Sequence, residues 1–337
     1  MPDKVELLIN NKIYSEWVDY SVSSDVYAAD TSFEVTIAYP DIDVNECDLC
    51  HLKVNDKIEL TGTIGAIKDT ISRGSPKITL TGHDLMGLVA NEYCEEFGTF
   101  ENLTIRALAE KFLRNIPYIS RKNIEFENNT EKLIVNKQFT QVEPGARVFE
   151  VLSNAAASRG LLFYCKADGT LVFTKPKTKG SSNFAIIRTK AGIDNNVLSS
   201  ERVRDADKRY RTIKIVGQQQ GQDGGSAEDV NVEATVVDST YPLKHKTFVM
   251  TCNEDADAPK LKAQLLMDKQ KREALQLSYT VQGHSYAGAN WAINEFCKVK
   301  DCCYNIEQSY LIYGREFSRS KTGGTTTRIS LGNPGAP

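Results

Sequence analysis

The sequence lacks any long apolar run. No stretch of its 337 residues approaches the roughly 20 apolar residues of a membrane-spanning helix. Met1 to Asn10 contains only one short apolar segment, Leu7-Leu8-Ile9, between charged residues. A signal peptide has a basic start and a longer apolar stretch. We therefore expect no membrane insertion, and we expect the chain to be made in a cytoplasm.

An excess of charge of one sign is also missing. The chain has 41 Lys and Arg and 44 Asp and Glu, a net charge of −3. This balance produces no overall field that attracts nucleic acid or an anionic membrane. With 41% hydrophobic and 25% charged residues, the composition is that of a soluble globular protein, and the length predicts two or three domains.

Common enzyme motifs are absent too. There is no P-loop, no G-x-G-x-x-G after a strand and no G-x-S-x-G nucleophile elbow. The four His residues lie singly along the chain. Two carboxylate pairs, Glu95-Glu96 and Glu125/Glu127, have the residue type that glycosidases use, but acidic pairs are also common on solvated surfaces. We therefore expect that the chain is not an enzyme.

The first ninety residues have a β pattern. Phe33, Val35 and Ile37 alternate with polar residues, which is typical of a strand with one buried face. Similar alternation recurs at residues 57–60 and 77–80. This region is predicted to form a β domain over residues 1–90.

Residues 91–178 change character. Between Ile105 and Phe112 the apolar residues fall on one helical face, and Thr104 is a suitable N-cap. A second helix is predicted over residues 146–159, with Gly160 at its end. Asp168-Gly169 then predicts the turn of a hairpin. This stretch is therefore predicted to be a small α+β domain.

The β pattern returns after residue 179 and is interrupted once. Residues 218–226 are polar and glycine-rich and predict a mobile loop. A third helix is predicted over residues 258–273, with Leu261 and Leu265 on its inner face. Its basic residues favour a solvated outer face over a nucleic-acid site, because no aromatic residues are interleaved with them. They are Lys260, Lys262, Lys269, Lys271 and Arg272.

The two β regions resemble each other. Val22-Ser23-Ser24-Asp25 has a counterpart in Leu198-Ser199-Ser200-Glu201, and the alternating residues from Phe33 have one in those from Tyr210. The closing segments, residues 77–80 and 328–331, also match. The pattern predicts two similar β domains, the second with an insertion, although short strand motifs of Ser, Thr and Ile also recur by chance.

Cys47-Asp48-Leu49-Cys50-His51 is the sharpest motif with possible chemistry. C-x-x-C-H attaches haem c, but that attachment normally takes place after export. A zinc site at Cys47, Cys50 and His51 requires a fourth ligand, such as Cys94 or His83, and the spacing differs from a zinc finger. We favour reduced thiols without metal, so these three residues are weak metal candidates and no cofactor is expected.

Several segments occur in an order and spacing that are known from one protein family. In that order they resemble the Mu-like phage baseplate hub proteins, also called late control or tail P proteins, over nearly the whole chain. The segments are Thr79-Leu80-Thr81-Gly82-His83-Asp84, Asn102-Leu103-Thr104-Ile105, residues 148–152, 159–162 and 169–173, the charged residues 201–211 with Gly217, and the closing Arg328-Ile329-Ser330-Leu331.

The resemblance implies a β-rich α+β fold with two similar β-barrel domains. Under it, residues 1–90 form the first barrel and residues 91–178 the small domain with two helices and a hairpin. Residues 179–217 and 276–337 form the second barrel, and residues 218–275 are an insertion with the mobile loop and helix.

The resemblance also implies a structural role in a contractile phage tail that injects DNA. Three chains would form a pseudo-six-fold ring that joins the three-fold central spike to the six-fold tail tube. The implied partners are a trimeric spike protein, the tail tube and other baseplate proteins, without specific nucleic-acid binding. The implied location is the baseplate of the virion tail, after assembly in the host bacterial cytoplasm. Two alternatives are a hub or spike component of a related contractile secretion system and, less favoured, a tail-associated cell-wall hydrolase that uses Glu95 or Glu96.

Overall fold

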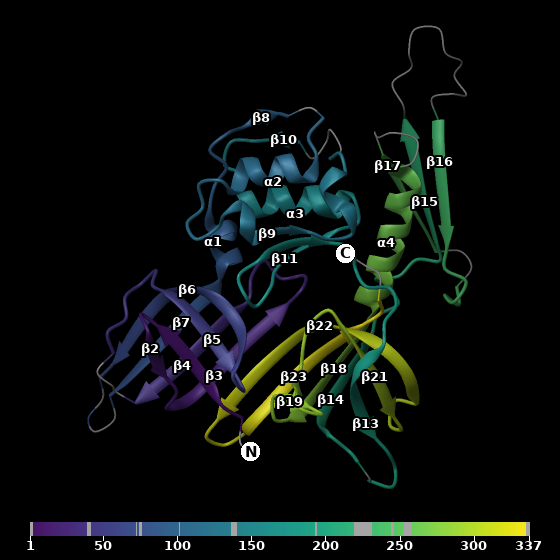
Figure 1. Ribbon diagram of the computed structural model, residues 1–337. Helices are drawn as coiled ribbons and strands as arrows, with labels where there is room; N and C mark the ends of the chain where they lie inside the picture. The colour runs from purple at the N-terminus through teal and green to yellow at the C-terminus, as the bar shows by residue number, and fades with distance from the viewer. Residues whose placement is uncertain are drawn as a thin grey trace.

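Two curved β units dominate the computed structural model of the protein. They lie side by side, a unit with helices lies above them, and a narrow sheet with one long helix stands beside that unit (Figure 1). Thirteen strands from both β units belong to one hydrogen-bonded sheet system. The structure describes residues 3–38, 42–71, 73, 76–100, 102–135, 140–192, 194–218, 231–243, 246–252 and 258–334.

The first barrel-like unit is built from strands with alternating burial. Val5, Leu7 and Ile9 point into the core and their neighbours do not, because successive side chains of a strand face opposite sides. Asn10 and Asn11 have positive φ at a two-residue turn, the conformation that tight hairpins require. The strands are β1 (Val5–Ile9), β2 (Lys12–Tyr14), β3 (Trp17–Asp25), β4 (Ser32–Ala38), β5 (Leu49–Val54), β6 (Lys57–Thr70) and β7 (Lys77–Asp84).

The small α+β unit follows directly and has its own apolar core. The predicted cap is confirmed, because Thr104 Oγ1 accepts a hydrogen bond from the Ala107 amide at 3.2 Å. Gly160 ends the second predicted helix with φ +69°, and the predicted hairpin is also present. The elements are α1 (Leu85–Asn91), β8 (Gly98–Thr99), α2 (Ile105–Leu113), β9 (Ile124–Phe126), β10 (Gln141–Val142), α3 (Val148–Ser158), β11 (Leu162–Cys165) and β12 (Leu171–Thr174), with 3₁₀ turns η1 (Arg121–Asn123) and η2 (Glu127–Lys132).

The second barrel-like unit closes the chain and pairs with the first. Its long strand β22 lies antiparallel to β3, with Gly314 opposite Asp25 and Arg319 opposite Tyr20. The apolar residues of both units form one continuous core. The strands are β13 (Ser182–Arg188), β14 (Val197–Arg204), β18 (Leu275–Gln282), β19 (Ser285–Tyr286), β20 (Ala289–Asn290), β21 (Glu295–Asp301), β22 (Ile306–Ser320) and β23 (Gly324–Gly332).

The insertion in the second unit begins earlier than predicted. Residues 179–217 were assigned to the second barrel, but β15 (Thr212–Gln218) pairs with β16 (Asn231–Val237) and β17 (Thr247–Cys252) in a separate sheet. Alternating burial predicts a strand but does not say which sheet the strand joins. The predicted mobile loop, residues 218–226, lies outside the described residues apart from Gln218.

The helix of the insertion, α4 (Ala258–Ala274), is confirmed, but its buried face is not the predicted one. Ala263 and Met267 are buried against the three-stranded sheet. The predicted stripe of Leu261 and Leu265 faces the small α+β unit instead, where the two side chains lie against Gly160. The helix therefore packs on two neighbours with two different faces.

Both barrel-like units contain the same four-strand arrangement. The order β3-β4-β7-β6 in the first unit corresponds to β14-β18-β23-β22 in the second, and all pairs are antiparallel. A β-bulge interrupts the same two pairs in each unit. The bulges lie between Trp17 and Asp19 and between Ile64 and Ala66 in the first unit, and between Val197 and Ser199 and between Ile312 and Gly314 in the second.

These bulges define which residues correspond, and they correct the repeat inferred from the sequence. The strand that contains Phe33 corresponds to β18, not to the strand after Tyr210, because the insertion separates β14 from β18. The Ser-Ser segments do lie on corresponding strands, but Val22 corresponds to Arg202, four residues from the match by sequence. An even offset keeps each side chain on the same face, so the sequence pattern does not detect it.

Candidate functional site

A buried ion pair joins the two barrel-like units. The Arg315 guanidinium on β22 contacts the Glu59 carboxylate on β6 and donates to the Trp291 carbonyl. Asn290 donates to the other Glu59 oxygen at 2.7 Å. A buried charge pair is stable only when such additional hydrogen bonds complete it. The pair and the β22–β3 ladder therefore hold the two units in one relative orientation.

A buried histidine lies at the same junction. His284 Nε2 lies 2.9 Å from the Tyr20 hydroxyl, and Nδ1 lies 3.1 Å from Thr327 Oγ1. The His284 amide donates to Asp3 at 2.9 Å. Burial lowers the pKa of the imidazole to about 4, so the ring is neutral at pH 7 and bridges the two units by hydrogen bonds.

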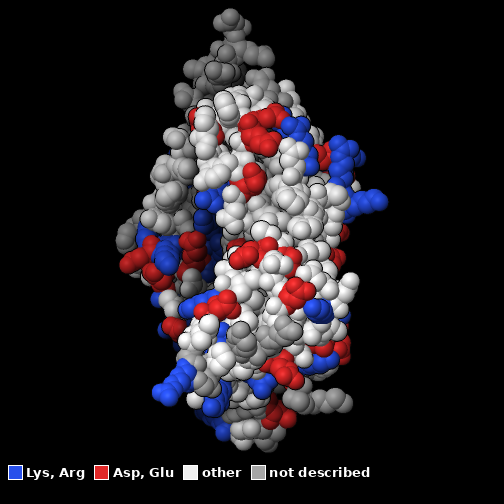
Figure 2. Space-filling model, turned by 90° about the vertical axis from the view of Figure 1, so that its left-hand side faces the viewer, with Lys and Arg blue, Asp and Glu red and all other residues white. Residues whose placement is uncertain are grey.

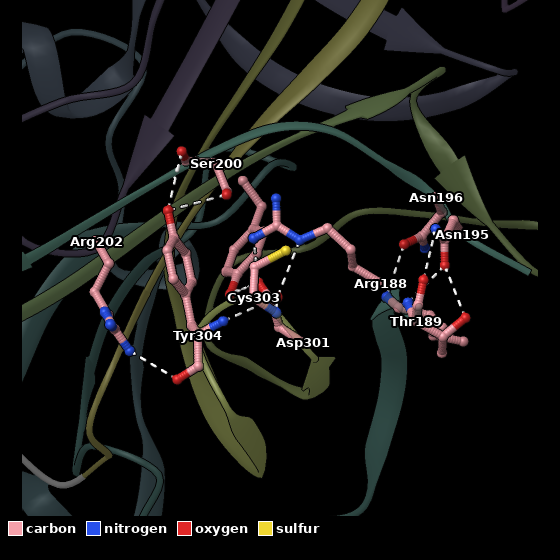
Figure 3. Close-up of polar contacts among 11 residues, drawn as sticks. Arg188, Thr189, Asn195, Asn196, Ser200, Arg202, Asp301, Cys303 and Tyr304 are labelled. Carbon is pink, nitrogen blue, oxygen red and sulfur yellow. Dashed lines mark hydrogen bonds and ion pairs between the residues drawn. The ribbon is translucent and has the colours of Figure 1, made fainter. Parts of the chain in front are cut away.

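A second polar cluster lies within the second barrel-like unit and is centred on Asp301 (Figure 3). Asp301 is 1% exposed and accepts from Arg188 Nε and Nη2 at 3.0 and 2.6 Å and from the Tyr279 hydroxyl at 2.9 Å. The backbone amides of Cys303 and Tyr304 also donate to Asp301, at 2.8 and 3.3 Å. Burial alone raises the pKa of Asp301, but these hydrogen bonds outweigh it and lower the pKa overall.

Possible metal ligands also meet at this cluster. One ligand atom each of Asp301, Cys302 and Cys303 lies within 4.8 Å of the others. The Asp301 oxygens are already occupied by Arg188, Tyr279 and the backbone, and the pKa of the Cys302 thiol is raised, which disfavours the thiolate that binds metals. The arrangement therefore supports a structural role for Asp301, which ties β13, β18 and β21 together.

The weak metal candidates of the sequence do not converge. Cys50 is fully buried in the first core, whereas the next residue, His51, points to the other face and contacts Thr61 Oγ1 at 3.0 Å. Cys47 is exposed, and burial raises the pKa of Cys50 to about 12. Cys50 lies opposite Gly62, as Cys297 lies opposite Tyr310 at the corresponding position of the second unit. Cys50 is thus one of two matching core residues.

Three of the four paired carboxylates form ion pairs, and Glu95 accepts a hydrogen bond from the Asn115 side-chain amide at 2.8 Å. Glu96 forms ion pairs with Lys111 and Arg114, and the hydrogen bond from Lys111 lowers the pKa of Glu96. Lys166 lies 2.7 Å from Glu125 and 2.9 Å from Glu127. A glycosidase acid needs a raised pKa to donate its proton. These ion pairs do not favour the hydrolase alternative.

Two of the five basic residues of α4 make contacts inside the chain. Lys271 lies 3.5 Å from Asp238, and the Arg272 guanidinium lies 3.5 Å from the centre of the Tyr27 ring. Among the described residues on the face of the molecule in Figure 2, acidic and basic side chains are interspersed, without a continuous patch of either sign. None of the helices in the described ranges is both long and apolar enough to cross a membrane.

The ion pairs Arg315–Glu59 and Arg188–Asp301 were not predicted from the sequence. Their partners are separated by 256 and 113 residues, and neither pair forms a motif of adjacent residues. The same holds for His284, which appeared in the sequence only as a single histidine. Only the strand order brings these groups together.

Residues 4–84 match the family model described as the N-terminal domain of the Mu phage baseplate assembly protein GpP-like. The first barrel-like unit is thus the part of the chain that is similar to this domain. The match ends at Asp84, the last residue of β7 and the N-cap of α1. The matched region therefore coincides with the first β unit of the structure.

Full-length comparisons extend the likeness over the rest of the chain. The baseplate hub protein gp44 of Escherichia phage Mu is 21% identical, over 98% of this chain and 88% of the relative. A tail protein from Neisseria meningitidis has a TM-score of 0.83 and 24% identity, covering 98% of this chain and 97% of that one. A prophage MuSo2 tail protein from Shewanella oneidensis has a TM-score of 0.79 and 18% identity, covering 98% of both chains.

These likenesses confirm the resemblance to Mu-like baseplate proteins and the β-rich α+β fold that it implied. The three relatives are described as tail or baseplate proteins. Their descriptions agree with the expectation that this chain is not an enzyme.

Proposed function

We propose that the chain is the baseplate hub of a contractile phage tail, a ring of three copies between a three-fold central spike and a six-fold tail tube. One observation carries this proposal: a single chain contains two four-strand units with the same order and the same two bulges. Three such chains present six similar units in a ring that keeps three-fold symmetry. A ring of this kind meets six tube subunits on one side and three spike subunits on the other.

The proposal includes the division of the chain. The two barrels form the ring, and the small α+β unit and the insertion stand on one side of both barrels (Figure 1). The trimeric spike protein, the tail tube and other baseplate proteins are the proposed partners. Assembly takes place in the host bacterial cytoplasm, and the mature location is the virion tail.

Light scattering at several protein concentrations tests the ring. Three chains of 37.5 kDa give about 112 kDa, and we expect that mass without dependence on concentration. The trimeric spike protein of the same phage should then bind at one spike trimer per three chains. A mass of 37.5 kDa that persists when the spike protein is added contradicts the proposal.

A further inference from the structure

One strand edge of each barrel-like unit has no strand partner in the described chain, although the corresponding edge of the other unit has one. Inside the chain, the second half of β22 is paired with β3. The second half of β6 corresponds to that part of β22, and β14 corresponds to β3. Among the described strands, β14 pairs only with β18, and Ala66–Thr70 of β6 pairs only with β7.

The paired edges are more buried than the corresponding unpaired edges. Gly314 and Phe317 on β22 are buried, whereas Ala66 and Asp69 at the corresponding positions of β6 are exposed. Five of the eight residues of β14 are exposed, whereas only one of the nine residues of β3 is. Two large apolar residues at these edges are also exposed, Ile71 at 84% and Val203 at 42%. Exposed edges with apolar side chains favour pairing with a further strand.

We propose that the β6 edge of one copy, Ala66–Thr70, pairs antiparallel with the β14 edge of a second copy, Glu201–Asp205, and repeats the β22–β3 junction between copies. This inference rests on the proposed ring of copies and names its subunit interface. The β22–β3 register, carried over through the bulges, places Ala66 opposite Asp205, Lys68 opposite Val203 and Thr70 opposite Glu201.

The backbone of β14 has the correct orientation for this pairing. The Asp205 amide donates to the Ala274 carbonyl at 2.9 Å, so the hydrogen-bonding groups of Asp205 face the β18 side. In an antiparallel ladder these groups alternate, so those of Arg204 and Arg202 point to the free edge. The Ser200 carbonyl, one step further, accepts from the Tyr304 hydroxyl at 3.1 Å, which marks the end of the free segment.

The charges of the two edges are complementary in this register. On one face, Lys68 lies diagonal to Glu201 and Asp205 of the next copy. On the other face, Asp69 lies opposite Arg202. Cross-strand and diagonal pairs of opposite charge stabilise a ladder, and like charges destabilise it. Because the two edges belong to different barrels, the interface is head-to-tail, and such an interface forms a ring when its rotation closes.

Cysteine cross-linking tests the register. Lys68 and Val203 form a non-hydrogen-bonded pair in the proposed ladder, with a Cα separation of about 4.5 Å, which a disulfide spans. The background carries Ser in place of the exposed Cys47, Cys302 and Cys303. We expect a mixture of Lys68→Cys and Val203→Cys chains to form a covalent dimer on oxidation, and neither variant alone to form one.

The matched control moves one cysteine by a single residue. Lys68→Cys mixed with Arg204→Cys places the thiols on opposite faces of the ladder and should give several-fold less product. Absence of the Lys68–Val203 product, or equal product in the control mixture, overturns the proposed interface. A mass of three chains without the specific product rejects this interface but leaves the hub function intact. The specific product in an assembly of another size supports the interface and rejects the trimer.

Discussion

Arg315 of the second barrel-like unit and Glu59 of the first form a buried ion pair, although 256 residues separate them. Their side chains are 5% and 10% exposed. The pair lies beside the strand ladder that joins the units, where Arg315 is opposite Ser24. The backbone hydrogen bonds of the ladder set the register of the two units. The ion pair adds an interaction that depends on the side chains of Arg315 and Glu59.

Replacement of Arg315 by Met should destabilise the protein by about 3 to 5 kcal/mol, because it leaves the Glu59 carboxylate buried without its cation. Chemical denaturation measures the change. The double variant Glu59→Gln, Arg315→Met should recover part of the loss. Arg319→Met, on an exposed position of the same strand, is the control and should change stability by less than about 0.5 kcal/mol. Equal losses of stability in Arg315→Met and Arg319→Met contradict the role of the pair.

His284 should make stability depend on pH. Its pKa in the folded protein is about 4, below the ordinary 6.5, because the ring is buried. As pH falls below 6.5 the unfolded chain binds a proton first, so the free energy of unfolding decreases until pH 4 is reached. The loss should reach about 3 kcal/mol relative to a His284→Gln variant. Urea titrations of the parent protein and the His284→Gln variant between pH 7 and pH 4 measure this loss. If the free energies of unfolding of the two proteins change in parallel with pH, the effect is excluded.

Asp301→Asn should destabilise the second barrel-like unit by about 2 to 4 kcal/mol, because Arg188 and Tyr279 lose a charged acceptor that is almost fully buried. Glu295→Gln is the control on the same strand. Its partner Lys177 lies at 2.6 Å, but both side chains are partly exposed, so the cost should be below about 1 kcal/mol. Thermal unfolding of both variants compares the two sites, and equal shifts contradict the structural role of Asp301.

Gly160→Ala should loosen the insertion as well as strain the backbone. Gly160 has φ +69°, and a Cβ there would lie 3.1 Å from Leu265 of α4. Gly192→Ala is a matched control, because Gly192 has φ +73° and no heavy atom within 4 Å of the added carbon. Both variants should lose about 1 kcal/mol from the positive φ. Only Gly160→Ala should accelerate proteolysis within the insertion, and equal rates contradict the contact.

Local features were predicted well from the sequence. The cap at Thr104, the stop at Gly160 and the hairpin at Asp168-Gly169 are confirmed, because each depends on residues a few positions apart. The helix α4 was also predicted, but the prediction of its core-facing side was wrong. Leu261 and Leu265 lie at helical spacing, but the helix packs on both the three-stranded sheet and the small α+β unit. The smaller Ala263 faces the sheet.

The candidate site shows the opposite case. C-x-x-C-H was the sharpest motif, but the strand separates Cys50 and His51 to opposite faces. The groups that do meet, such as Arg188 with Asp301, are far apart along the chain. A strand pattern is compatible with many partners, so it predicts neither the pairing nor the charges that the pairing buries.

The sequence by itself determined the alternating strands, the capped helices and the repeat of a β unit, because these depend on local spacing and on the side-chain period of a strand. Only the tertiary structure decided that β15 leaves the barrel, that β14 corresponds to β3 with a shift of four residues, and that β22 joins the two units. Strand order and register arise from long-range pairing. A register shift by an even number of residues keeps the same side chains on the buried face, so the alternation of apolar and polar residues does not reveal it.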